Sequence, residues 1–234
     1  MEAVAREVLA SRPDALVFCG DLTWGPMPEE TWRVVRELRD SVGESVFYVR
    51  GNAERALAEL RTGAQGRRPT VRERWMLARH AEGTLDTFEA FSTTVTLNVM
   101  GLGSTRFCHG SPRSDEELIT PGTPDERMRA LLDQVDERVL VSAHTHVQFD
   151  RRVVGIRSIN PGSVGMPYQG TSGAYWALLG PDVEHRRTDY DVGAAVAACR
   201  ASDDPLAEAI VETLTTPPAP AEAIAAAEAL RCSA

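Results

Sequence analysis

The 234-residue sequence predicts an α/β fold, and two observations carry this prediction. Near the N-terminus, apolar segments at 15–19 and 45–49 alternate with amphipathic segments, an order typical of a parallel or mixed sheet. The second half is instead rich in short strand-like segments separated by turn residues, so we expect two sheets rather than one. These later segments are 149–165, 175–179 and 183–190.

The first expected elements are helices that flank buried strands. Residues 2–10 place apolar side chains on one helical face, and Pro13 ends that helix. Residues 15–19 are uniformly apolar, as in a strand that is covered on both faces. An amphipathic helix over 28–40, with a proline near its start, precedes the second strand, and a further helix is expected over 53–60.

The middle of the chain is less regular. Residues 61–74 form a basic connection that contains glycine. The segments 93–99 and 105–108 predict a hairpin. A helix is expected over 124–135, and 138–146 reads as a strand that runs into a loop.

The composition changes near residue 191. Residues 191–234 are rich in alanine and contain a proline-rich linker at 215–222, so we expect a helical C-terminal extension beside a main domain over 1–190. The extension has no cluster of metal-binding residue types, which is typical of a packing arm or a dimerisation element. A homodimer is therefore one expectation.

Composition indicates a globular protein, with 43% hydrophobic and 25% charged residues. The net charge of −9 argues against a broad nucleic-acid or membrane surface held by charge alone. No long apolar run or basic-apolar leader is present, so a cytoplasmic location is expected. The cysteines are scattered without a CxxC pair and are expected to be reduced, namely Cys19, Cys108, Cys199 and Cys232.

Four apolar strands end in polar residues of metal-binding types. Asp21 and Asn52 follow the first two strands, His109 follows a third, and His144 and His146 follow a fourth. Taken alone, each has an ordinary alternative, since Gly-Asp and Gly-Asn are turn signals and a lone histidine is commonly a core residue. Because ligands bind beyond the carboxyl ends of strands in α/β sheets, we expect the five to converge. This mixture of oxygen and nitrogen donors suits Mn, Fe, Zn or Ni.

The motifs GDLTWGP, GN, CHGSPR, AHTH and NPGSVG resemble, in order and spacing, those of the calcineurin-like metallophosphoesterases. The resemblance spans roughly residues 1–190 and is greatest to the compact bacterial and archaeal phosphodiesterase branch. It implies a four-layer α/β/β/α sandwich and hydrolysis of a small phosphorylated substrate. The reaction expected for this family is attack by metal-bound hydroxide at a site with two metals.

The resemblance also implies roles for the five polar residues. Asp21 corresponds to the carboxylate that bridges the two metals. Asn52, His109 and His144 correspond to the other ligands of one metal, and His146 to a ligand of the second. Asp21, Asn52 and His109 are therefore also the expected catalytic residues.

The sequence departs from the family pattern in its first strand. Family members usually begin with a strand carrying Asp-x-His, which supplies two ligands to the second metal, and this sequence begins at the following helix. The second site is therefore expected to bind weakly. We favour a working protein that begins upstream; the alternatives are a short form with one metal that hydrolyses weakly or senses a phosphorylated ligand, and a non-catalytic interaction protein.

A second departure concerns leaving-group and substrate contacts. Ala53 stands where the family often has a histidine that assists the leaving group. Arg113 is a candidate for binding phosphate through its two-pronged guanidinium, with a surface arginine as the alternative. Arg67, Arg68 and Arg72 are expected to lie in a mobile solvated loop, or else to steer a phosphorylated substrate.

Overall fold

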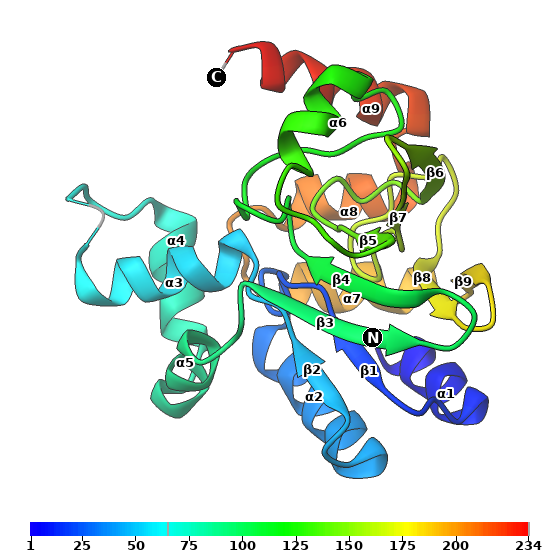
Figure 1. Cartoon of the computed structure of the whole chain (residues 1–234). Helices are drawn as coiled ribbons and strands as arrows, with labels where there is room; N and C mark the ends of the chain where they lie inside the picture. Colours follow the sequence, from blue (N-terminus) through cyan, green and yellow to red (C-terminus); the bar gives the residue numbers. More distant parts are fainter. Residues whose placement is uncertain (65, 234) are drawn as a thin grey trace.

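The computed structural model describes residues 1–64 and 66–233. Side chains are described as far as Leu230, so the predicted free thiol of Cys232 lies outside the described side chains. The chain folds as a mixed α/β protein (Figure 1). The strands are β1 (Leu16–Phe18), β2 (Val46–Tyr48), β3 (Thr94–Val99), β4 (Gly103–Cys108), β5 (Val139–Val141), β6 (Phe149–Val153), β7 (Ile156–Asn160), β8 (Ala174–Leu179) and β9 (Val183–Thr188). The helices are α1 (Glu2–Ser11), α2 (Pro28–Val42), α3 (Asn52–Thr62), α4 (Val71–Arg79), α5 (Glu82–Glu89), α6 (Asp125–Leu131), α7 (Val192–Ala201), α8 (Ala207–Thr215) and α9 (Pro220–Ser233).

The described strands form three sheets. A five-stranded mixed sheet has the order β3-β4-β5-β7-β6, in which β4, β5 and β7 run parallel and the two outer pairs are antiparallel. The hairpin of β3 and β4 confirms the one predicted from the sequence. The other two sheets have two strands each: β1 and β2 run parallel, and β8 and β9 run antiparallel.

Hydrophobic clusters order these elements into layers. Val17 of β1 and Leu179 of β8 pack against Phe107, Val139 and other residues of the five-stranded sheet, forming an apolar layer between strands. On the far side of β1, the buried faces of α1 and α2 pack in a second cluster. Helix α6 packs against the opposite face of the five-stranded sheet. This helix-strand-strand-helix order, visible in Figure 1, agrees with the predicted α/β sandwich.

Parallel pairing brings the ends of strands together. In the β1-β2 pair, Phe18 lies opposite Tyr48, so the loops that carry Asp21 and Asn52 leave the same edge. In the β4-β5 pair, Phe107 lies opposite Val141, so the segments that begin at His109 and Ser142 also leave together. The register therefore brings the polar residues together two segments at a time, once in each of these two sheets.

Two helices were not predicted. The connection expected at 61–74 gives way at Val71 to α4, and α5 follows it. The Thr70 hydroxyl accepts a hydrogen bond from the Glu73 N–H (3.2 Å), and the Glu73 carboxylate accepts one from the Thr70 N–H (2.7 Å). This capping box is a sequence signal for the start of a helix.

Two of the three arginines singled out in this region, Arg67 and Arg72, pair with acidic side chains. Arg67 pairs with Glu73 (2.6 Å). Arg72 pairs with the buried Asp204 (3.1 Å), and its side chain is only 13% exposed. The expectation of a mobile solvated loop is therefore wrong for Arg72, because α4 directs it toward the segment between α7 and α8.

The C-terminal residues form the helices that the sequence predicts. Helices α7 and α8 enclose their own small apolar cluster, to which Met166 and Tyr190 contribute. Helix α9 begins at Pro220, inside the predicted linker, because proline is tolerated in the first turn of a helix. A domain boundary at residue 190 remains a prediction.

Candidate metal centre

Asp21 lies in the loop after β1, and Asn52 is the first residue of α3, directly after the loop that follows β2; these two loops approach each other closely. Gly20 has φ of 91°, and a Cβ atom on it would lie 2.7 Å from the Gly51 Cα. A Cβ atom on Gly51 would lie 2.2 Å from the Asp21 Oδ1. The loops can meet only because both positions are glycine. The Ala53 N–H donates to the Asp21 Oδ1 (2.9 Å) and fixes one carboxylate oxygen there.

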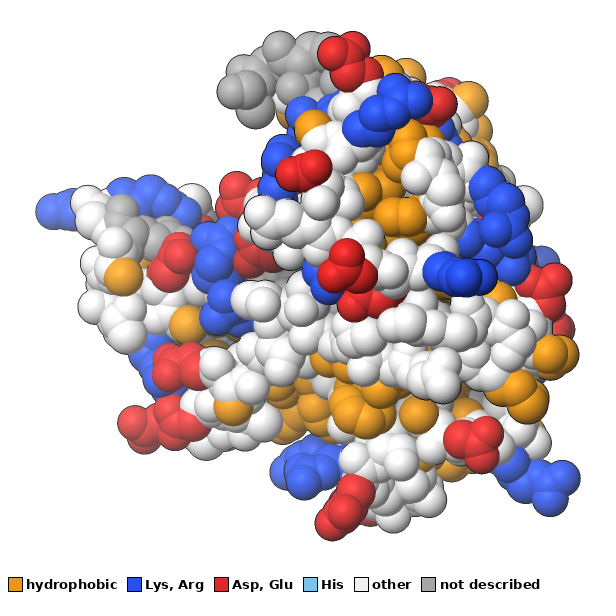
Figure 2. Space-filling view, viewed as in Figure 1, with side chains coloured by type: hydrophobic (Ala, Val, Ile, Leu, Met, Phe, Trp, Pro, Cys, Tyr) orange, Lys and Arg blue, Asp and Glu red, His pale blue; other side chains and the backbone are white. Residues whose placement is uncertain are grey.

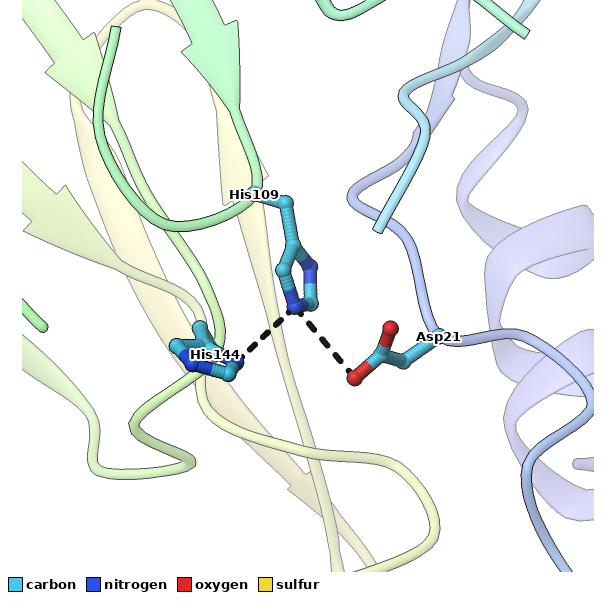
Figure 3. Close-up of side chains that lie close together, drawn as sticks. All are labelled: Asp21, His109 and His144. Atoms are coloured by element: carbon cyan, nitrogen blue, oxygen red, sulfur yellow. Dashed lines mark hydrogen bonds and ion pairs between the residues drawn. The ribbon is translucent and has the colours of Figure 1, made fainter. Parts of the chain in front are cut away.

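His109 lies at the centre of the site, as Figure 3 shows. Its side chain is 2% exposed, and its Nδ1–H donates to the Cys19 carbonyl (2.7 Å). The Nε2 therefore presents its lone pair when the ring is neutral. Around it lie the Asn52 Oδ1 (3.0 Å), the His144 Nδ1 (3.0 Å) and the Asp21 Oδ2 (3.3 Å).

These four side chains fit a divalent cation. Ligands bound about 2.0–2.2 Å from a metal lie roughly 2.8–3.6 Å from one another, the shorter separations in octahedral and the longer in tetrahedral geometry. The three distances from the His109 Nε2 to Asn52, His144 and Asp21 fall in that range. The donor atoms of Asp21, His109 and His144 all lie within 4.8 Å of one another. One proton between two ring nitrogens satisfies only part of this cluster, whereas a cation satisfies every member.

The loop that carries His144 has an unusual backbone. His144 and His146 have φ of 62° and 59°, which is the left-handed region and is uncommon for residues other than glycine. Asn160 holds this loop, because its Nδ2 donates to the Ala143 carbonyl (2.8 Å) and to the Thr145 hydroxyl (3.0 Å). The NPGSVG motif thus supports the candidate site from the neighbouring strand β7.

The site shifts the pKa values of its members. Burial acts to raise the pKa of Asp21, but the hydrogen bond and charge of His109, with the Ala53 N–H and the charge of His144, together leave that pKa lowered. Burial acts to lower the pKa of His109, but the hydrogen bond and charge of Asp21, with the Cys19 carbonyl and the charge of Glu54, together leave that pKa raised. Burial and the neighbouring His109 lower the pKa of His144. Burial lowers the pKa of His146 to about 4. His144 and His146 are therefore neutral at pH 7 and can offer lone pairs to a cation.

His146 lies apart from the four-residue group. Its ring stacks obliquely on Tyr168, with centroids 4.9 Å apart. Its Nδ1 is buried without a hydrogen-bond partner, which is the kind of atom that a cation satisfies. The backbone is left-handed at both His144 and His146, and the two side chains have different neighbours. The His144 ring lies beside His109, and the His146 ring lies beside Tyr168.

Arg113 lies outside this group as well. Its side chain is 54% exposed, and its guanidinium binds Glu117 through the Nε (2.9 Å) and an Nη (2.6 Å). To bind phosphate it must exchange this carboxylate for the substrate. Its substrate-binding role remains a prediction.

Glu54 is a member of the site that sequence reasoning missed. It is 1% exposed, and it accepts hydrogen bonds from the backbone N–H groups of Asp21, Leu22 and Gly51. Burial raises the pKa of Glu54, and the charge of Asp21 adds to that rise. Glu54 stands three residues after the N-cap Gly51 and supplies the half of a capping box that a glycine N-cap allows, so its spacing was a signal available in the sequence.

Comparison with known proteins identifies the class. The sequence model of the calcineurin-like phosphoesterase superfamily domain matches residues 1–180. The chain belongs to this superfamily, whose members depend on metal ions. This confirms the family resemblance of the motifs.

Solved structures show the same fold. One is a hypothetical protein of Pyrococcus horikoshii OT3, with a TM-score of 0.77, 16% identity and coverage of 93% of each chain. Another is a metallophosphoesterase of Sphaerobacter thermophilus, with a TM-score of 0.69, 24% identity and coverage of 90% of this chain and 93% of the other. No curated protein matches the sequence. The family supports a general phosphoesterase role.

Proposed function

We propose that this protein is a metal-dependent phosphodiesterase or phosphatase that hydrolyses small phosphate esters at a dinuclear site. The observation that carries the proposal is the convergence of Asp21, Asn52 and His144 on the His109 Nε2 at 3.0–3.3 Å. Oxygen and nitrogen donors of this kind suit Mn, Fe, Zn or Ni. Divalent cations held there would supply a Lewis acid for the phosphoryl oxygens and would activate a water molecule.

Each residue has a proposed part. Asn52, His109 and His144 would hold one cation together with Asp21, and His146 would hold a second, also with Asp21. The Cys19 carbonyl fixes the tautomer of His109 so that its Nε2 faces the cation. The Ala53 N–H orients Asp21. The second position has fewer ligands among these residues, so we expect it to bind its cation more weakly.

Fewer residues are proposed to contact the substrate than to hold the cations. Arg113 is proposed to bind the phosphate after leaving Glu117. Basic and acidic side chains are interspersed on the face drawn in Figure 2, without a broad basic surface. Together with the net charge of −9, this mixed face favours a small substrate over a nucleic acid. Among the described residues, no helix has the length and apolarity to cross a bilayer. A cytoplasmic location and a homodimer remain part of the proposal.

One observation favours an alternative function. Ala53 is buried at 2% exposure and offers no side-chain proton to a leaving group. A protein that binds a phosphorylated ligand with little turnover would have the same site. The two functions differ in whether bound ester is hydrolysed.

An activity assay separates them. We expect the protein with Mn²⁺ to hydrolyse bis(p-nitrophenyl) phosphate, and Asp21→Ala or His109→Ala to abolish that activity because each removes a proposed ligand. The exposed Asp40→Ala is the matched control and should retain full activity. Activity that persists in both site variants would refute the assignment. Binding of phosphate without turnover in the unsubstituted protein would favour the alternative function.

A further inference from the structure

A buried carboxylate joins the two loops of the candidate metal centre. Glu54 lies in the first turn of α3 and is 1% exposed. Its Oε1 accepts from the Leu22 N–H (2.8 Å), and its Oε2 accepts from the N–H groups of Asp21 (2.9 Å) and Gly51 (2.8 Å). One side chain thereby binds the loop after β1 and the loop after β2.

These contacts exceed what helix capping requires. Helix capping explains the bond between Glu54 and Gly51, since a glutamate at the third helical position accepts from the N–H of the N-cap residue, here Gly51. Asp21 and Leu22 belong to a different loop, more than 30 positions earlier in the chain. Their two N–H groups have no part in capping α3, so these two bonds serve the junction between the loops.

The junction leaves little freedom for a substitute. A Cβ atom on Gly51 would lie 2.9 Å from the Glu54 Oε2, so backbone and carboxylate are in direct contact. A carboxylate offers only acceptors, which matches three N–H donors. A glutamine amide would instead turn an NH₂ group toward at least one of these donors. An aspartate would lose one methylene group of reach.

We propose that Glu54 is a positioning residue of this centre, which sets the separation between Asp21 and Asn52 by holding the backbone of both loops. The inference rests on the proposed function. Asp21 has φ of 55°, so its orientation depends on contacts outside the strand, and the bond to its own N–H is one of them. Groups behind metal ligands typically contribute 10–100-fold to metal affinity.

The test compares Glu54→Gln with Glu59→Gln in the full chain. Glu59 lies further along α3, where it pairs with Arg55, so its substitution removes the same charge from the same helix away from the junction. We expect Glu54→Gln to bind Mn²⁺ about 10–100-fold more weakly, measured by electron paramagnetic resonance of free Mn²⁺. We also expect its Co²⁺ complex to have a changed visible spectrum, because that spectrum reports ligand geometry. Glu59→Gln should match the unsubstituted protein in both.

Glu54→Asp separates position from charge and serves if Glu54→Gln does not fold, as judged by circular dichroism. It keeps the charge but not the reach, so it should also weaken Mn²⁺ binding and alter the Co²⁺ spectrum. Affinity and spectrum unchanged in Glu54→Asp or in folded Glu54→Gln would overturn the proposal. If the unsubstituted protein binds no Mn²⁺, the proposed metal centre itself fails, which is a distinct result.

Discussion

At the scale of single residues, Ala53 shows what one side chain changes. Its N–H holds the Asp21 Oδ1, so the backbone at this position contributes to the site. Its methyl group is buried and has no proton to give. The backbone N–H of Ala53 therefore still orients Asp21, but the side chain lacks the acidic proton that the histidine of many family members supplies there.

A leaving-group series tests this residue. General acid assistance typically contributes about 10²–10⁴-fold, and without it the rate depends on the stability of the departing anion. We expect the hydrolysis rate of aryl phosphodiesters to fall steeply as the pKa of the departing phenol rises. The same series with Mn²⁺ alone supplies the background rates. A rate that is independent of phenol pKa would show that another group donates the proton.

At the scale of elements, α4 and the segment after it hold the loop that carries Asp21. The His80 Nδ1–H donates to the Met76 carbonyl (2.8 Å), so its Nε2 accepts from the Thr23 hydroxyl (2.8 Å). Arg72 donates to the Trp24 carbonyl (2.9 Å) and pairs with Asp204. The C-terminal extension is thus connected through Arg72 to the loop after β1.

The His80 contact predicts a pH effect on stability. Burial lowers the pKa of folded His80 below its ordinary value of 6.5. Above that value the ring is neutral in both states, so its stabilising contribution is fully present. As pH falls below it, the unfolded chain takes up a proton that the folded protein does not, and the free energy of unfolding decreases.

Urea unfolding at about pH 7.5 and about pH 5.5 measures this effect. We expect His80→Gln to lose less stability than the unsubstituted protein over that interval, because glutamine does not titrate. The other histidines are present in both proteins, so the difference isolates His80. Equal losses in the two proteins would contradict the prediction.

At the scale of the whole molecule, the layers come from two sets of strands. Among the described residues, β1 is hydrogen-bonded as a strand only to β2, and β8 only to β9. The β1-β2 sheet and the β8-β9 sheet nevertheless pack on the same face of the five-stranded sheet. Apolar packing against the five-stranded sheet, and not strand pairing, therefore holds the two smaller sheets in place among the described residues.

Much of this arrangement was predictable from sequence, for identifiable reasons. Uniformly apolar strands and amphipathic helices such as α2 have strong patterns, and the strand-end residues follow from the convergence of parallel strands. Helix α4 was not predicted because the arginines around its start favoured a basic connection over 61–74, although the Thr70–Glu73 capping box marks the start of a helix there. The role of Glu54 depends on contacts between loops far apart in the chain, which local sequence does not reveal. The separation of His146 from His144 depends on left-handed backbone at both residues.

Calorimetric titration of Mn²⁺ into chelator-treated protein tests the central claim most directly. The account predicts about one tightly bound Mn²⁺ per chain, lost in His109→Ala because the central ligand of the cluster is removed, and retained in Asp40→Ala. Any second Mn²⁺ should bind more weakly. Absence of tight binding in the unsubstituted protein, or undiminished binding in His109→Ala, would contradict the assignment of a metal centre at these residues.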